Sequence, residues 1–218
     1  MKIVPAQTFI LNESEVKNAL QKVVQAARTC YKAEKDNPTI EEDIRTYRNL
    51  ISKGHEAMLE HAVISAKIIT DRGVTHELVR HRIASFAQES TRYCNYSKGK
   101  FNNEITVIEP CFWSDGTDPY RGTKYKAWYD SCLAAEKAYL CLIEFGATAQ
   151  EARSVLPNSL KTEIVVTMNL REWRHFFRLR YFGTTGKPHP QMVEVSKMLY
   201  DQFNIIDPIL LEDLNEKN

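Results

Sequence analysis

Residues 163–180 read EIVVTMNLREWRHFFRLR and hold two patterns of secondary structure in direct succession. The β-branched residues at 164–166 predict a strand over 163–168. Asn169 and Glu172 then have the spacing of a helix N-terminus, in which a capping side chain is followed three residues later by an acid. The stretch therefore predicts a strand that leads directly into a helix.

Apolar periodicity along the rest of the chain predicts more helices than strands. Two helices begin with capping-box spacing, at Asn12 with Glu15 and at Thr39 with Glu42. The predicted helices cover 12–28, 39–53, 75–81, 120–145, 148–157 and 190–203, and further strands cover 62–70 and 103–109. Because these elements do not alternate regularly, the sequence favours an α+β fold.

The size and charge of the chain fit one globular domain without a strong electrostatic field. It has 218 residues, of which 43% are hydrophobic and 26% charged, so we expect a single domain over residues 1–218. The 29 basic and 28 acidic side chains leave a net charge of +1. Nucleic acid and membrane surfaces are therefore not expected as partners, and any anion site must be local.

The cysteines and the amino-terminal segment indicate the compartment. The five cysteines are odd in number and contain no C-x-x-C pair, which argues against a disulfide framework and against a structural zinc site. The first residues, MKIVPAQ, lack an apolar core before a cleavage site, and no stretch approaches the length of a membrane span. We expect a soluble cytoplasmic protein.

The most unusual segment is RHRIASFAQESTRYCNYS at residues 80–97. Arginine offers a planar fork of donors that matches phosphate, and Ser90 and Thr91 can add hydroxyl and backbone donors around the same anion. The segment could therefore build a phosphate pocket. The alternative is a solvated helix end followed by a polar loop.

A second basic run lies in the helix predicted after Asn169. Its arginines stand at 171, 174, 178 and 180, and such a helix repels itself unless anions or acids lie beside it. Asn169 and the first-turn N–H groups could hold a ligand acceptor, but the side chain could equally well only cap the helix. Both interpretations stay open.

Two nucleotide motifs and one metal motif are missing from the sequence. His55 and His61 in KGHEAMLEH stand six residues apart, whereas a zinc-protease helix needs histidines at i and i+4, so no metal site is predicted. No glycine-rich dinucleotide fingerprint or Walker loop occurs. Any nucleotide would therefore be held by side chains.

The segment Arg80–Ser85 resembles the R-H-R-x-x-S signature of the flavin-dependent thymidylate synthases. The resemblance extends to Ser90 and Arg92, to KGHEAMLEH at 53–61, to ARSVLPN at 152–158 and to TMNLREWRHFFRLR at 167–180. It covers most of the chain, from about residue 28 to residue 189.

This resemblance implies a homotetramer of α+β protomers, each built around a central sheet flanked by helices, with ligand sites where subunits meet. It implies FAD contacts from Arg80, His81, Arg82, Gln88, Asn169, Leu170, Arg171 and His175, with His55 and Ala57 reaching the flavin from a neighbouring subunit. It implies dUMP contacts from Glu77, Leu78, Val79, Arg80, Gln88, Glu89, Ser90, Thr91, Arg92, Arg153 and Arg180.

The implied reaction is the methylation of dUMP to dTMP. In this family the methylene of 5,10-methylenetetrahydrofolate is transferred by way of FAD that NADPH reduces, and no cysteine nucleophile is required. Arg180 is the candidate catalytic residue, because a permanently cationic group against the uracil edge stabilises negative charge on the ring. Ser90 and Arg92 are expected to bind the phosphate.

Two positions depart from the family pattern. At Ala87-Gln88-Glu89, some relatives place a carboxylate one position before Glu89, which leaves open whether Gln88 or Glu89 takes that role. At Ala57 a hydroxyl residue can occur in relatives, so a flavin contact there would come from the backbone.

Two other classes of function use the same arginines. One is another nucleotide-binding flavoprotein, which only the signature disfavours. The other is a non-catalytic nucleic-acid-binding protein, against which the nearly neutral net charge argues.

Overall fold

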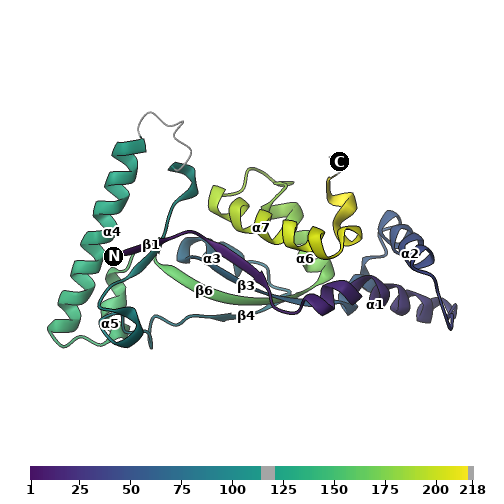
Figure 1. Cartoon of the computed structure of the whole chain (residues 1–218), viewed down its shortest axis with the longest axis horizontal. Helices are drawn as coiled ribbons and strands as arrows, with labels where there is room; N and C mark the ends of the chain where they lie inside the picture. The colour runs from purple at the N-terminus through teal and green to yellow at the C-terminus, as the bar shows by residue number, and fades with distance from the viewer. Residues whose placement is uncertain (114–120, 216–218) are drawn as a thin grey trace. The chain divides into compact units, whose positions relative to one another are not determined.

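Helices and strands both occur in the computed structural model, which describes residues 1–113 and 121–215 (Figure 1). The strands are β1 (Lys2–Val4), β2 (Gln7–Ile10), β3 (Val63–Asp71), β4 (Ala84–Gln88), β5 (Thr106–Ile108) and β6 (Lys161–Asn169). The helices are α1 (Glu13–Tyr31), α2 (Ile40–Ser52), α3 (Arg72–Leu78), α4 (Arg121–Glu144), α5 (Ala149–Ala152), α6 (Leu170–Arg180) and α7 (Pro190–Ile206), with 3-10 turns η1 (Glu56–His61), η2 (Gly99–Phe101), η3 (Cys111–Trp113), η4 (Arg153–Val155) and η5 (Pro208–Asn215). The predicted mixture of sheet and flanking helices is confirmed.

The described strands form two sheets. A parallel pair joins β1 to β5, with Ile3 opposite Val107, and a second sheet has the order β2-β3-β6-β4. The chain divides into two compact units. Unit 1 consists of Met1–Gln7, Ile68–Arg80 and Ala87–Ile164, and unit 2 of Thr8–Lys67, His81–Phe86 and the described residues from Val165 onward. Whether residues 1–218 act as one domain stays a prediction.

The core of unit 1 forms where the long helix α4 packs against β5 and its neighbours. Cys132 and Tyr139 of α4 are buried with Ile105, Val107 and Leu160. Short helix α5 lies against α4 (Figure 1). The predicted helix over 120–145 is thus found, although Tyr120 itself lies outside the described residues.

The core of unit 2 is aromatic and centres on α6. Trp173, Phe176 and Phe177 lie fully buried on one face of this helix and contact one another. Trp173 and Phe177 also pack against Phe203 of helix α7, which lies beside α6 (Figure 1). The indole N–H of Trp173 donates to the carbonyl oxygen of Ile64 at 3.1 Å. This packing fixes which face of α6 remains available for charged groups.

Two of the predicted helix starts are confirmed in their capping geometry. Thr39 and Glu42 form a capping box at α2, and Asn169 accepts a hydrogen bond from the backbone N–H of Glu172 at 2.9 Å. At Asn12 the predicted helix start is confirmed, because Asn12 is the residue that directly precedes α1, but the predicted side-chain cap is wrong, because the side chain bonds β3 instead. It accepts from the N–H of Ser65 at 2.9 Å and donates to the carbonyl of Val63 at 3.3 Å.

Two further elements differ from the sequence prediction in the region of residues 71–88. Helix α3 begins at Arg72 and not near residue 75, because Asp71 caps it by accepting from the N–H of Val74 at 2.7 Å. Strand β4 was not predicted at all, since its polar and small residues lack the β-branched content of a typical strand. The R-H-R signature therefore lies in the turn that follows the C-terminal cap of α3 and precedes β4.

The carboxyl-terminal turn η5 is held to unit 2 by a buried arginine. The side chain of Arg174 is 1% exposed and donates to the carbonyl of Leu210 and to the carboxylate of Asp213, both at 2.6 Å. Tyr47 of α2 also donates to the carbonyl of Leu210, at 2.9 Å. Burial lowers the pKa of Arg174 and the hydrogen bond to Asp213 raises it, and the net result is a raised pKa.

None of the described helices is both long and apolar enough to cross a membrane.

We expect Asp213→Ala to lower the free energy of unfolding by about 2 kcal/mol or more, because it leaves the buried Arg174 charge without its carboxylate. Urea unfolding measures this. The matched control is Asp201→Ala, which removes an exposed i,i+4 partner of Lys197 and should cost about 0.5 kcal/mol or less. Equal losses in the two variants would contradict the importance assigned to the buried pair.

Candidate functional site

His81 is the centre of a hydrogen-bonded chain in unit 2. It is only 3% exposed, and its Nδ1 lies 2.8 Å from a carboxylate oxygen of Glu172. The guanidinium Nε of Arg180 donates to His81 Nε2 at 3.2 Å. An arginine can only donate, so Nε2 must be the acceptor and Nδ1 must carry the proton that Glu172 accepts. The ring is therefore neutral.

The protonation of His81 agrees with this geometry. Burial away from water lowers its pKa below the ordinary value of 6.5, and the nearby charge of Arg180 acts in the same direction. Glu172 favours the charged ring but does not overcome these effects. The Glu172–His81–Arg180 chain thus holds the side chain of Arg180 at the end of α6 without placing a second positive charge beside it.

Further predicted flavin contacts lie close to this chain. The ring centroid of His175 is 5.7 Å from that of His81. Asn169 caps α6 through its side-chain oxygen, and Leu170 is buried, with its N–H bonded to the carbonyl of Ala62 at 2.8 Å. Contacts of Leu170 with a ligand would therefore have to be made by its backbone.

Donor atoms of His81, Glu172 and His175 lie within 4.8 Å of one another, as metal ligands do. However, both ring nitrogens of His81 already take part in hydrogen bonds. Metal binding would require one of these bonds to break, so we interpret the cluster as a hydrogen-bonded network.

The remaining arginines of α6 lie beside acids, as their mutual repulsion requires. Arg171 pairs with Glu56 at 3.3 Å and with Glu60 at 2.7 Å, and Arg178 pairs with Glu56 at 3.3 Å. These acids belong to the segment KGHEAMLEH. The segment and the basic helix are therefore parts of one charged surface in unit 2.

A pocket of about 460 Å³ brings together three predicted flavin contacts, His55, Ala57 and Arg171. We call it the His55 pocket. Tyr31 also lines it, and the Tyr31 hydroxyl lies 3.4 Å from Nδ1 of His55. These residues come from α1, η1 and α6, so the fold of unit 2 gathers them from distant parts of the sequence.

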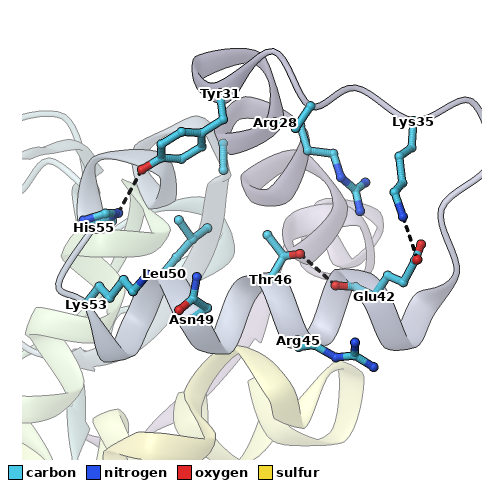
Figure 2. A pocket seen from close by; sticks show the side chains of 12 residues that line it. Arg28, Tyr31, Lys35, Glu42, Arg45, Thr46, Asn49, Leu50, Lys53 and His55 are labelled. Carbon is cyan, nitrogen blue, oxygen red and sulfur yellow. Dashed lines mark hydrogen bonds and ion pairs between the residues drawn. The ribbon is translucent and has the colours of Figure 1, made fainter.

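A second pocket, of about 520 Å³, shares Tyr31, Leu50 and His55 with the first one (Figure 2). We call it the basic groove, because Arg28, Lys35, Arg45 and Lys53 all line it. Arg28 is paired with Asp43 and Lys35 with Glu42, each at 2.7 Å. No carboxylate within the described ranges pairs with Arg45 or Lys53, so the groove has a positive excess.

Apart from Arg180, which belongs to unit 2, the predicted nucleotide contacts lie in unit 1. The loop after β4 carries Ser90, whose hydroxyl accepts from the N–H of Arg92 at 3.3 Å. Arg153 reaches the same loop and donates to the hydroxyl of Thr91 at 3.4 Å. Arg92 itself donates to Gln150 at 2.8 Å. Two guanidinium groups and two hydroxyls thus lie along one loop, as an anion site requires.

The remaining predicted residues differ in what their side chains can contact. Leu78 is fully buried, so only its backbone could contact a ligand, whereas Arg80 and Arg82 are exposed. Arg80 belongs to unit 1 and Arg82 to unit 2. The carboxylate of Glu89 is paired with Lys161 at 3.3 Å.

A family model described as "Thymidylate synthase complementing protein" matches residues 12–209. The flavin-dependent thymidylate synthase of Geobacter sulfurreducens is 35% identical over 164 residues, which cover 72% of this chain and 67% of the relative. That of Pyrococcus horikoshii is 42% identical over 132 residues, covering 60% and 51%. The chain belongs to the family of flavin-dependent thymidylate synthases.

The alignments span about half to two thirds of the length of these relatives. A solved structure of a UMP/dUMP methylase from Streptomyces cacaoi, bound with 5-Br dUMP, is similar to this chain with a TM-score of 0.79. It covers 97% of this chain and 96% of the other at 20% identity, which supports the fold. The family resemblance stated from the signature is confirmed.

Sequence reasoning missed the acids of this family member's site region. Glu172 was assigned to the helix start only, although it is the partner of His81. Glu56 lies within KGHEAMLEH, and no pattern in the sequence connects it with Arg171 and Arg178, with which it pairs. The one usable signal was the self-repulsion of a helix with four arginines, which predicted acids nearby without identifying them.

The neutral state of His81 predicts a loss of stability in acid. Its contribution is fully present above about pH 6.5, the pKa of an unfolded histidine, and is lost as the pH falls toward the lowered folded pKa. The slope is at most about 1.4 kcal/mol per pH unit for one proton. Urea unfolding should show that the free energy of unfolding falls less between pH 7 and pH 5 in His81→Asn than in the wild type.

The exposed His76→Asn provides the control for this measurement, because it removes a histidine that takes no part in the Glu172–His81–Arg180 chain. The free energy of unfolding of this control should fall between pH 7 and pH 5 by as much as that of the wild type. If it falls by the same amount in His81→Asn, the neutral ring assigned to His81 is incorrect.

Proposed function

We propose that this chain methylates dUMP to dTMP as a flavin-dependent thymidylate synthase, with 5,10-methylenetetrahydrofolate as one-carbon donor and NADPH as the source of reducing equivalents for FAD. The observation that supports this most is the chain Glu172–His81–Arg180, since it holds the guanidinium of Arg180 against His81 of the family signature. Family membership supplies the class of reaction.

The chemistry of unit 2 fits a flavin dinucleotide. FAD combines a flat ring system with two phosphates, and the His55 pocket adjoins a basic groove in which Arg45 and Lys53 have no acidic partner among the described residues. We assign His55, Ala57, Arg171 and His175 to FAD. When bound and reduced, FAD supplies the hydride equivalent for the reaction.

The loop of unit 1 fits the phosphate of dUMP. Ser90 and Arg92 are two residues apart and joined by a hydrogen bond, and Arg153 approaches the same loop through Thr91. Guanidinium and hydroxyl donors bind phosphate more strongly than water-exposed neutral groups do, because the hydrogen bonds are charge-assisted. These side chains would fix the nucleotide by its phosphate and leave its base to be aligned by other residues.

Arg180 is the proposed catalytic residue. Its guanidinium remains charged at every relevant pH and is oriented by the neutral His81. Placed against the uracil edge, it would stabilise the negative charge that develops on the ring when carbon 5 becomes nucleophilic. Its orientation is fixed before the substrate binds, which lowers the reorganisation required during the reaction.

The assembly and compartment remain part of the proposal. A homotetramer would allow His55 and Ala57 of one protomer to contact the flavin of another, and the odd number of cysteines is in keeping with the reducing cytoplasm. Analytical ultracentrifugation of the purified protein tests whether it forms a homotetramer.

Purified protein should be yellow and should show flavin absorption that bleaches when NADPH is added without oxygen. Absorption spectroscopy before and after FAD addition provides the measurement. A protein that stays colourless with excess FAD would rule out the proposed function, whereas one that binds FAD but does not act on dUMP would point to a different nucleotide-binding flavoprotein.

Arg180→Ala should lower tritium release from carbon-5-labelled dUMP by at least about 100-fold, the usual effect of removing one group that stabilises transition-state charge. Cys94→Ala is the control and should keep activity close to that of the wild type, because the proposed reaction uses no thiol. An inactive Cys94→Ala enzyme that still binds FAD and dUMP would indicate a covalent cysteine mechanism instead.

A further inference from the structure

The side chain of Gln88, the last residue of β4, is held by two buried threonines of unit 1. Its Nε2 donates to the hydroxyl oxygen of Thr75 at 3.0 Å and to that of Thr162 at 3.2 Å. Thr75 comes from α3 and Thr162 from β6, and they are 0% and 1% exposed. Both N–H groups of the amide are therefore directed into the protein.

The hydrogens of Thr75 determine which way this amide faces. The Thr75 hydroxyl donates its single proton to the carbonyl of Arg72 at 3.0 Å. Toward Gln88 it can therefore only accept, so the group that meets it must be NH₂ and not the carbonyl oxygen. A flipped amide would bring two acceptor oxygens together at a buried position where water cannot replace the lost bond.

The amide oxygen of Gln88 is consequently the atom left for another partner. Among the described residues, no hydrogen bond to Gln88 Oε1 occurs. The carboxylate of the neighbouring Glu89 is paired with Lys161 at 3.3 Å, and the Glu89 N–H is bonded to the carbonyl of Glu163 at 2.8 Å. Of the two candidates for the acidic position of the family, Gln88 is the one whose side chain is not held by a charged neighbour.

We propose that Thr75 and Thr162 are positioning residues that lock Gln88 with its oxygen toward the bound pyrimidine nucleotide, so that the site presents a fixed, neutral acceptor to an N–H or O–H donor of that ligand. This inference rests on the proposed function, since it takes dUMP as the ligand. The nucleotide offers two such donors, the imide N–H of the base and the 3′-hydroxyl of the sugar.

A carboxylate at this position would behave differently. The ionised side chain of a Gln88→Glu variant can only accept hydrogen bonds. It therefore cannot donate to the hydroxyl oxygen of Thr75, whose own proton is bonded to the carbonyl of Arg72. When protonated it gains one donor and can restore one of the two bonds. The variant should therefore bind dUMP more weakly than the wild type at neutral pH and recover affinity as the pH is lowered.

The experiment measures dUMP binding to the FAD-loaded protein by calorimetry at pH 5.5, 6.5 and 7.5. We expect about a tenfold loss of affinity at pH 7.5 for Thr75→Val, which removes the hydroxyl at nearly constant volume, and for Gln88→Glu, in line with the loss of one well-placed hydrogen bond. Thr75→Ser keeps the hydroxyl and should restore affinity to within about threefold of the wild type. When the dUMP affinity of each variant is divided by that of the wild type at the same pH, only Gln88→Glu should show a higher ratio at pH 5.5 than at pH 7.5.

Two analogues identify the donor on the ligand. N3-methyl-dUMP lacks the imide N–H and 2′,3′-dideoxy-UMP lacks the 3′-hydroxyl. The analogue without the relevant donor should bind more weakly than dUMP to the wild type, and the difference should shrink in Gln88→Glu at pH 7.5.

The outcomes separate this inference from the proposed function. A wild type that binds neither FAD nor dUMP refutes both. A wild type that binds both, together with Thr75→Val and Gln88→Glu variants of unchanged dUMP affinity, refutes the inference alone. Thr75→Val could be destabilised because Thr75 is buried, but Gln88 is only half-buried, so Gln88→Glu keeps the test decisive.

Discussion

The charge of a guanidinium cannot be removed by titration, and this constraint explains much of unit 2. Helix α6 carries four arginines, and the fold provides each with a partner of the right kind. Arg171 and Arg178 lie beside Glu56, and the buried Arg174 is paired with Asp213 of the last turn. Arg180 donates to a histidine that stays neutral. The partners of these arginines thus differ in kind: Arg171, Arg174 and Arg178 lie beside carboxylates, whereas Arg180 lies beside a neutral imidazole.

Hydrogen-bond direction has the same role at both groups of candidate residues. At His81, a partner that can only donate selects the tautomer of the ring. At Gln88, a hydroxyl whose proton is already used selects the orientation of the amide. In each case a buried neighbour fixes the donor and acceptor pattern of a polar side chain in advance. Such preorganisation is what a site needs if it is to align a flat ligand without reorganising on binding.

The sequence predicted most of the long helices and strands, but it did not predict the short strand β4, the start of α3 or the partners of the candidate site residues. Helices α2, α4, α6 and α7 and strands β3 and β6 follow from periodicity and capping patterns, and Asn169 is a cap as expected. Strand β4 was missed because its residues are polar or small, and α3 was shifted because Asp71 rather than a residue near 75 starts it. Candidate arginines could be named from the signature, but Glu172, Thr75 and Thr162 could not, since they approach the site only through tertiary contacts between segments far apart in the chain.

The basic groove has a practical consequence for handling the protein. Arg45 and Lys53 line an open surface, where small multivalent anions compete with any ligand phosphate and where ionic screening acts over about 10 Å at 0.1 M salt. Sulfate and phosphate buffers would therefore compete for the positive surface that we propose for the phosphates of FAD. Ligand affinities measured in such buffers would reflect the buffer as much as the protein, and dilute zwitterionic buffers avoid this competition.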